Sequence, residues 1–497
     1  MISRIAGLVR DMVIATVFGA SPAADAFFIA FRIPNFFRRL FAEGAFSAAF
    51  VPVLTTARSN GSHAEVRQLV ARVAGTLAAV LLLLTAAAII GAPWLALAFA
   101  PGFVDDPVRL GLTTDLLRLT FPYLLLISMT ALAGGVLNAY QRFGVPAVTP
   151  VLLNLCLIGA ALGLVHVFEV PIMALGVGVL LGGVLQVLVQ LPFLRRLDLL
   201  SCPQWAWREP GVRRVLLLML PAVFGASVAQ INLLVDAWIA SYLTVGSVSW
   251  LYYADRLVEL PVGVLAIGLA TVTLPLLSRF DVSADRAGFA DTLDWSLRVG
   301  ALITLPAALA LSLLANPLMF TLFEHGAFTE LDARMAGVAL RVYAVGLLGF
   351  VGVKLLLPGY YARQDTRTPV RIALLCIAVN LALNLASMRW FGHVGLALST
   401  SAAALLNAFL MYVGLVRTGV YRASALWRRD LIAIASGCAL MAGLLLWGAQ
   451  QIDWSTSARI DRVLWLASLC VAGSVVYGAT LYAFGLRLAM LRSPSRL

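Results

Sequence analysis

Apolar segments of membrane-spanning length follow one another along almost the whole chain. The chain is 61% hydrophobic and 12% charged, which is more apolar surface than a water-soluble fold can bury. Inside a bilayer the backbone polar groups must be satisfied within the protein, and segments of this length do so as helices. The sequence therefore predicts an all-α, polytopic membrane protein with about fourteen transmembrane helices. Their approximate spans are 2–19, 24–57, 68–100, 109–138, 146–166, 171–194, 213–243, 247–278, 291–323, 332–361, 370–388, 394–416, 429–449 and 463–485.

Arginines predict the orientation of these helices. The loops after odd-numbered segments hold only Arg109, Arg389, Arg459 and Arg462, whereas most other loop arginines follow even-numbered segments or lie at the C-terminus. Because positive charge is retained on the cytoplasmic side, both termini are predicted to be cytoplasmic. The first segment is short for a span, which suggests either an upstream start codon or a missing part of helix one.

Several function classes are disfavoured by what the sequence lacks. Its five cysteines form no CxxC pair, its four histidines fall near predicted loops, and no GxxxxGK[ST] phosphate loop occurs. A disulfide framework, a His/Cys metal cluster and ATP hydrolysis by this chain alone are therefore not expected. The net charge of +12 is explained by topology and by attraction to anionic lipid head groups, without a nucleic-acid partner.

An internal repeat relates the two halves of the chain. Equivalent residues lie 221 to 224 positions apart, as in the pairs Arg32/Arg256, Gly102/Gly326 and Arg142/Arg363. Six segments repeat as the next six, so the halves have the same orientation, as in transporters whose halves rock around a site between them. We predict an N-lobe at 1–200, a C-lobe at 211–420 and two additional helices at 425–497.

Ionisable residues lie at membrane depth in the first two segments and again in segments seven, eight and ten. Each charge at a helix centre costs roughly 2.5–3.5 kcal/mol, so such residues normally face a bundle interior or an aqueous cavity. Arg10, Arg38 and Arg256 lie well inside their segments, and guanidinium forks suit phosphate oxygens. They predict a cavity for a phosphate or diphosphate group. Arg32 and Arg39 fit equally well as side chains that reach the interface or pair with acids.

A weaker polar pattern lies in the second half. Asn380 and Asn384 share a helix face, Thr400 lies on the next segment and Asp236 on segment seven. One carboxylate with amide and hydroxyl oxygens could hold a hard cation such as Na⁺. Hydrogen bonding between helices is the alternative explanation.

Three long runs carry a resemblance to a known family: Asp25 to Pro52, Ser249 to Pro261 and Pro358 to Pro369. They resemble signatures of the MurJ (MviN) lipid II flippase family, within the multidrug/oligosaccharidyl-lipid/polysaccharide exporter (MOP) superfamily, and the resemblance covers nearly the whole chain. It implies two six-helix lobes around a cationic cavity, with a groove for the lipid tail on the two added helices.

The resemblance also assigns candidate residues. It places a Na⁺ site on Asp236, Asn380, Asn384 and Thr400, with Asn384 in the position of an acid in a relative. Substrate-binding residues would be Arg4, Arg10, Asp11, Asp25, Arg38, Glu43 and Arg256.

The expected function is flipping of lipid II, an undecaprenyl-pyrophosphate-linked peptidoglycan precursor, across the bacterial inner membrane by alternating access. The chain would not be an enzyme, and cell-wall synthesis proteins are left open as partners. One alternative is a cation-coupled small-molecule exporter of the same superfamily, which the cationic cavity disfavours. Another is a membrane scaffold without transport, for which so many buried charges would be costly.

Overall fold

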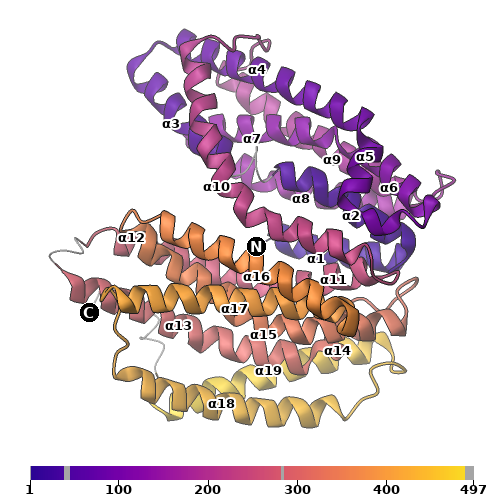
Figure 1. Cartoon of the computed structure of the whole chain (residues 1–497), viewed down its shortest axis with the longest axis vertical. Helices are drawn as coiled ribbons and strands as arrows, with labels where there is room; N and C mark the ends of the chain where they lie inside the picture. The colour runs from indigo at the N-terminus through magenta and orange to yellow at the C-terminus, as the bar shows by residue number, and fades with distance from the viewer. Residues whose placement is uncertain (1, 39–44, 281–284, 487–497) are drawn as a thin grey trace. The chain divides into compact units, whose positions relative to one another are not determined.

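The fold is entirely helical in the part that the computed structural model describes, residues 2–38, 45–280 and 285–486 (Figure 1). The chain divides into two compact units, Met1–Ser249 and Trp250–Leu497, each described here by itself. The all-α prediction is confirmed. Ten helical stretches of the described chain are long and apolar enough to cross a membrane, so the count of fourteen remains a prediction.

The first unit contains ten α-helices in its described part. They are α1 (Ile2–Phe18), α2 (Pro22–Arg38), α3 (Ala45–Asn60), α4 (His63–Ile90), α5 (Ala92–Phe99), α6 (Pro107–Thr120), α7 (Tyr123–Ala139), α8 (Gly144–Gly159), α9 (Met173–Arg196) and α10 (Pro210–Ala240). Helix α10 packs against α2, α3, α4 and α5, so its contacts place it in this unit. The predicted lobe boundaries at residues 200 and 211 stay a prediction.

The loops rich in arginine gather at one end of the first unit. Arg58, at the end of α3, donates a hydrogen bond to the carbonyl of Ala139 at the end of α7. Arg67, at the start of α4, lies 3.4 Å from Asp198, just after α9. At the other end, the Gly102 N–H donates to Ser241 Oγ over 3.0 Å. Alternate helix ends thus lie together, which is the arrangement that the positive-inside prediction requires.

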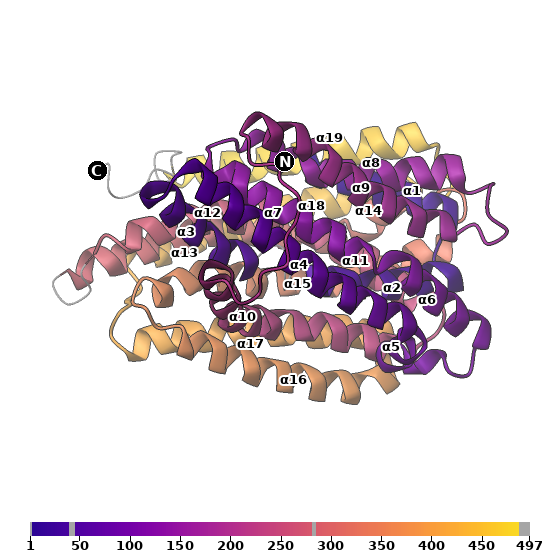
Figure 2. The same ribbon diagram turned by 90° about the horizontal axis from the view of Figure 1, so that it is seen from above.

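The second unit begins within α11 and ends with a helix pair. Its helices are α11 (Ser247–Pro261), α12 (Ile267–Leu277), α13 (Arg286–Leu313), α14 (Ala315–Leu322), α15 (Glu330–Tyr361), α16 (Arg367–Phe391), α17 (His393–Arg417), α18 (Leu426–Ala449) and α19 (Arg459–Ala483). A π-helical turn at Val262–Ala266 directly follows Pro261, the last residue of α11. Helices α18 and α19 lie side by side; α18 packs on α13 and α19 on α14 (Figures 1 and 2).

Helix α15 packs closely against α17 because glycine removes a side chain at the contact. A Cβ added to Gly346 would lie 2.9 Å from the Cα of Ser401. The Ser401 hydroxyl donates to the Val342 carbonyl over 3.0 Å, which fixes this part of α17 against α15. The small residue therefore sets the distance between these two helices.

Replacing Gly346 with alanine should destabilise the second unit by about 1–3 kcal/mol, because the backbone of α17 must move. The measurement is thermal unfolding of the purified protein in detergent. Gly443→Ala on α18 is the matched control, since a Cβ there meets nothing within 4 Å. Equal melting temperatures for the Gly346 variant and the parent would show that the contact does not limit stability.

Candidate functional site

A buried ion pair lies on α1, and its arginine also bonds to α8. Arg10 donates to Asp11 Oδ1 from Nε over 2.8 Å and from Nη2 over 2.6 Å. Its Nη1 donates to Asn154 Oδ1 over 3.1 Å, and Asn154 Nδ2 donates to the Ser3 carbonyl over 3.1 Å. Arg10 is 6% exposed and Asp11 is fully buried. The guanidinium thus holds α1 against α8, and its predicted contact with substrate remains a prediction.

Two other candidate arginines of the first unit are less enclosed. Arg4 is half-buried on α1 and forms no hydrogen bond or ion pair with a residue that the structure describes. Arg38 is half-buried at the end of α2, and its Nε donates to Asn35 Oδ1 over 3.0 Å. Glu43, another candidate, lies outside the described residues. Arg4 and Arg38 are therefore more exposed than Arg10.

Asp25 has a structural task that the sequence did not reveal. Its carboxylate accepts hydrogen bonds from Gly246 N (2.7 Å), Ser249 N (2.9 Å) and Ser249 Oγ (2.6 Å). These donors lie at the start of α11, where helical N–H groups have no partner within the helix. Asp25 is only 1% exposed, so it acts as a distant cap of α11 and is enclosed by the protein.

In the second unit, Arg256 is three-quarters buried on α11. Its Nη1 lies 2.8 Å from Glu259 Oε2, and its Nη2 donates to the Tyr252 hydroxyl over 3.3 Å. The guanidinium carbon also lies 5.7 Å from the centre of the Tyr252 ring. Neighbours one turn away therefore orient this guanidinium on its own helix.

The structure brings together three of the four residues predicted to bind sodium. Asn384 Nδ2 donates to Asn380 Oδ1 over 3.0 Å, and Asn380 Nδ2 donates to Thr400 Oγ1 over 3.4 Å. Asp236 is half-buried on α10 in the first unit, so its place relative to this cluster is not described. The bond from Asn380 to Thr400 links α16 to α17, as the hydrogen-bonding explanation expects, and Na⁺ binding by this cluster stays a prediction. The described residues contain no group of three His, Cys, Asp or Glu side chains placed to bind a metal.

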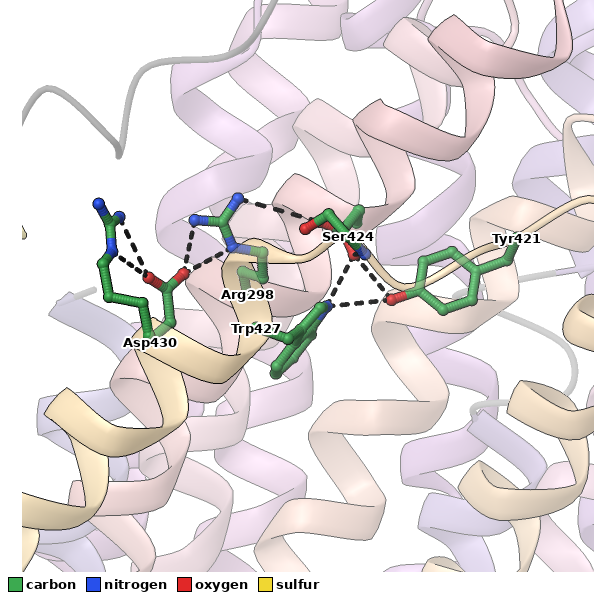
Figure 3. A network of polar contacts seen from close by, with 7 residues as sticks. Arg298, Tyr421, Ser424, Trp427 and Asp430 are labelled. Carbon is green, nitrogen blue, oxygen red and sulfur yellow. Dashed lines mark hydrogen bonds and ion pairs between the residues drawn. The ribbon is translucent and has the colours of Figure 1, made fainter.

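A polar network that the sequence did not suggest anchors the start of α18 (Figure 3). Asp294 on α13 is 3% exposed and accepts hydrogen bonds from the Tyr421 hydroxyl (2.8 Å), the Ser424 hydroxyl (2.7 Å) and Trp427 Nε1 (2.7 Å). Burial, and then the hydrogen bond to Asp294, raise the pKa of Tyr421 above its ordinary value, so its hydroxyl remains a donor. One carboxylate thus fixes the linker before α18.

Ion pairs of Asp430 extend this network along α18. Arg298, one turn after Asp294, donates from Nε to Asp430 Oδ2 over 2.6 Å. Arg429 lies on the other side of the same carboxylate, 3.3 Å from Asp430 Oδ1. Asp430 is 3% exposed, so the pairing offsets a charge that would otherwise be costly to bury.

The helix pair is also anchored by α19. Arg462, near the start of α19, pairs with Glu324 just after α14 and donates to the Phe320 carbonyl over 3.1 Å. The sequence showed Arg462 only as a loop arginine. For the contacts at the start of α18, the sequence did contain a signal: Asp294 and Asp430 stand near the starts of segments 291–323 and 429–449. The partners of these acids could not be identified from spacing.

Comparison with known proteins shows which family this chain resembles along its length. A family profile described as "Lipid II flippase MurJ" matches residues 14–464. The probable lipid II flippase MurJ of Vibrio cholerae serotype O1 is 44% identical to this chain, over 99% of this chain and 95% of its own length. A solved structure of lipid II flippase MurJ in an inward closed conformation is 26% identical, has a TM-score of 0.79, and covers 97% of this chain and 96% of that one.

The fold is shared more widely. An inward-facing multidrug resistance MATE family transporter of the MOP superfamily matches with a TM-score of 0.70 at 13% identity, covering 84% of this chain and 94% of that one. At that identity the likeness concerns the fold alone. The family profile and the full-length relative go further, and they confirm the resemblance carried by the three sequence runs: the chain belongs to the lipid II flippase MurJ family.

Proposed function

We propose that this chain flips lipid II across the bacterial inner membrane. The observation that carries the proposal is the match to the lipid II flippase family profile over residues 14–464 and to a probable lipid II flippase over 99% of this chain. A multi-pass helical membrane protein of a flippase family makes and breaks no bond in this function. We further propose that both termini are cytoplasmic, as the arginine distribution favours.

Arginines would bind the pyrophosphate of the substrate. Arg4 and Arg38 in the first unit and Arg256 in the second are only partly buried, and guanidinium forks suit bidentate bonding to phosphate oxygens. Arg256 would exchange its contacts with Glu259 and Tyr252 for bonds to the phosphate. Arg10 would contribute by fixing α1, on which Arg4 also lies. Alternating access would then expose the bound head group to one side of the membrane at a time.

The helix pair α18–α19 would hold the polyprenyl tail in this proposal. Its outward-facing side chains include Leu440, Leu464 and Val471, each more than half exposed, which suits contact with a hydrocarbon chain. The anchors at Asp294 and Arg462 would keep this surface in a fixed place beside the rest of the second unit.

Complementation tests the proposed function in cells. A bacterial strain depleted of its own lipid II flippase should grow when it expresses this chain and should lyse with an empty vector. The amount of the chain in the membrane fraction should equal that of a control protein that does not complement. A difference in growth then does not reflect a difference in membrane insertion. Lysis despite normal membrane insertion would oppose the proposal.

The alternative function is a cation-coupled exporter of small molecules, which the MATE-like fold keeps open. Cells expressing this chain would then resist cationic dyes, and the purified protein would export them without lipid II. The arginine-rich candidate set disfavours this alternative, because cationic substrates need acidic or aromatic sites.

Sodium coupling is a separate proposal that rests on Asp236, a carboxylate within the apolar helix α10. If Na⁺ neutralises it, flipping should rise with sodium at fixed membrane potential, and Asp236→Asn should abolish that dependence. The measurement is the initial flipping rate in vesicles over a sodium series, with choline keeping the ionic strength constant. A parent rate that does not change with sodium would reject this coupling and leave protons or membrane potential as the driving force.

A further inference from the structure

A groove with an apolar floor and a basic rim lies at the C-terminal end of α9. Its volume is about 570 Å³, and its floor is formed by Leu188, Leu191, Pro192 and Leu200. Arg195 and Arg196, in the last turn of α9, form the rim. All of these residues belong to the first unit, and none of them is among the predicted substrate-binding residues.

The two rim arginines are available for an anionic ligand. Both are exposed, and neither forms an ion pair with an acid in the part of the chain that the structure describes. The guanidinium carbon of Arg196 lies 5.6 Å from the centre of the Phe193 ring, which holds it near the helix. The nearest acid in sequence, Asp198, lies instead 3.4 Å from Arg67 on α4. The rim thus carries two unneutralised charges directly beside an apolar floor.

The segment after α9 indicates the depth of the groove in the membrane. Gln204 N donates to the Ala71 carbonyl over 2.9 Å and Ala206 N to Thr76 Oγ1 over 3.1 Å, so this extended segment lies along α4. The alternate residues Trp205 and Trp207 project outward and are 56% and 50% exposed. Tryptophan in such exposed positions is typical of the boundary between hydrocarbon and head groups. Asp198, two residues after the rim arginine Arg196, contacts Arg67, which lies one helical turn before Ala71 on α4. The rim of the groove therefore lies close to the level of this segment, at the head groups.

We propose that this groove binds an anionic glycerophospholipid of the leaflet at the arginine-rich end. Its phosphate would accept hydrogen bonds from Arg195 and Arg196, and one acyl chain would lie along Leu188, Leu191 and Leu200. Charge complementarity selects a phosphate, and the apolar floor selects a lipid over a free ion. This lipid is a bound component of the membrane and is distinct from the transported substrate, so the proposal does not depend on flipping.

Native mass spectrometry of the delipidated full-length protein tests the proposal by titration with phosphatidylglycerol. We expect the first molecule to bind at least tenfold more tightly than phosphatidylcholine with the same acyl chains. Arg195→Gln/Arg196→Gln should weaken phosphatidylglycerol binding about tenfold, because charge-assisted hydrogen bonds are lost. Leu191→Trp should weaken it as well, because the indole fills the floor while both charges remain.

Arg213→Gln/Arg214→Gln is the matched control. This pair is also adjacent and exposed near the same end, in the first turns of α10, but it does not line the groove. Binding to this control should equal binding to the parent. Equal weakening in both double variants would mean a general charge effect and would overturn the proposal, as would unchanged binding in the groove variants. Displacement of phosphatidylglycerol by millimolar inorganic phosphate would identify an ion site instead and would also overturn it.

Discussion

Arg10→Ala should abolish lipid II flipping and destabilise the first unit by about 3–5 kcal/mol, the usual cost of leaving one member of a buried ion pair alone. Asp11 is fully buried, and Arg10 supplies two of its hydrogen bonds as well as the bond to Asn154. Without the guanidinium, α1 loses its side-chain bond to Asn154 on α8 and keeps the bond from Asn154 to the Ser3 carbonyl. The measurements are the melting temperature in detergent and the flipping rate in vesicles.

A double variant separates stability from function at this site. Arg10→Ala/Asp11→Asn removes both charges, so most of the lost melting temperature should return. If flipping stays absent in this stable variant, Arg10 is needed for more than its ion pair. Arg10→Lys should restore little activity, because a single ammonium cannot reproduce the bonds to Asp11 and Asn154 together. Wild-type stability in the single Arg10→Ala variant would show that the pairing is not important.

Asp294→Ala should reduce flipping at least tenfold by releasing the start of α18. The change removes the acceptor shared by Tyr421, Ser424 and Trp427, each of which contributes roughly 1–3 kcal/mol as a bond to a charged group. Hydrogen–deuterium exchange should increase in residues 421–430 and remain unchanged in the first unit. This local increase would distinguish loss of the anchor from general unfolding.

Asp291→Ala is the control for this variant. Asp291 lies three residues earlier on α13, is exposed, and forms no hydrogen bond or ion pair with a described residue. Its flipping and exchange should match those of the parent. Normal flipping by Asp294→Ala with increased exchange at 421–430 would show that a fixed α18 is not required for transport.

The sequence predicted the fold class and the ends of the helices well because these depend on local properties. Hydropathy over about twenty residues defines a span, and arginines such as Arg67 and Arg195 mark its ends. Segment 109–138 was predicted as one long element, whereas the structure has α6 ending at Thr120 and a separate α7 starting at Tyr123. Hydropathy stays high on both sides of Pro122, so it could not show this division.

The candidate site was predicted less completely because charge pairing is determined by tertiary packing. The sequence singled out Arg10 and Asp25 as charges within apolar segments, but their partners Asn154 and Ser249 lie 144 and 224 residues away. No periodicity in the sequence relates such distant positions. Asp294 was missed for the same reason, since it reads as an ordinary acid near a helix start until Tyr421 and Trp427 are placed beside it.

Transbilayer movement of fluorescent lipid II by the purified protein in sealed vesicles is the most direct test of the proposed function. The wild-type protein should make inner-leaflet lipid II accessible to a membrane-impermeant quencher at a rate proportional to the number of protein molecules per vesicle. Arg38→Ala/Arg256→Ala should remain folded yet fail to do so, because the forks proposed to bind the pyrophosphate are gone. Wild-type vesicles that move lipid II no faster than protein-free vesicles would contradict the proposal, and full activity in the double variant would contradict its arginine mechanism.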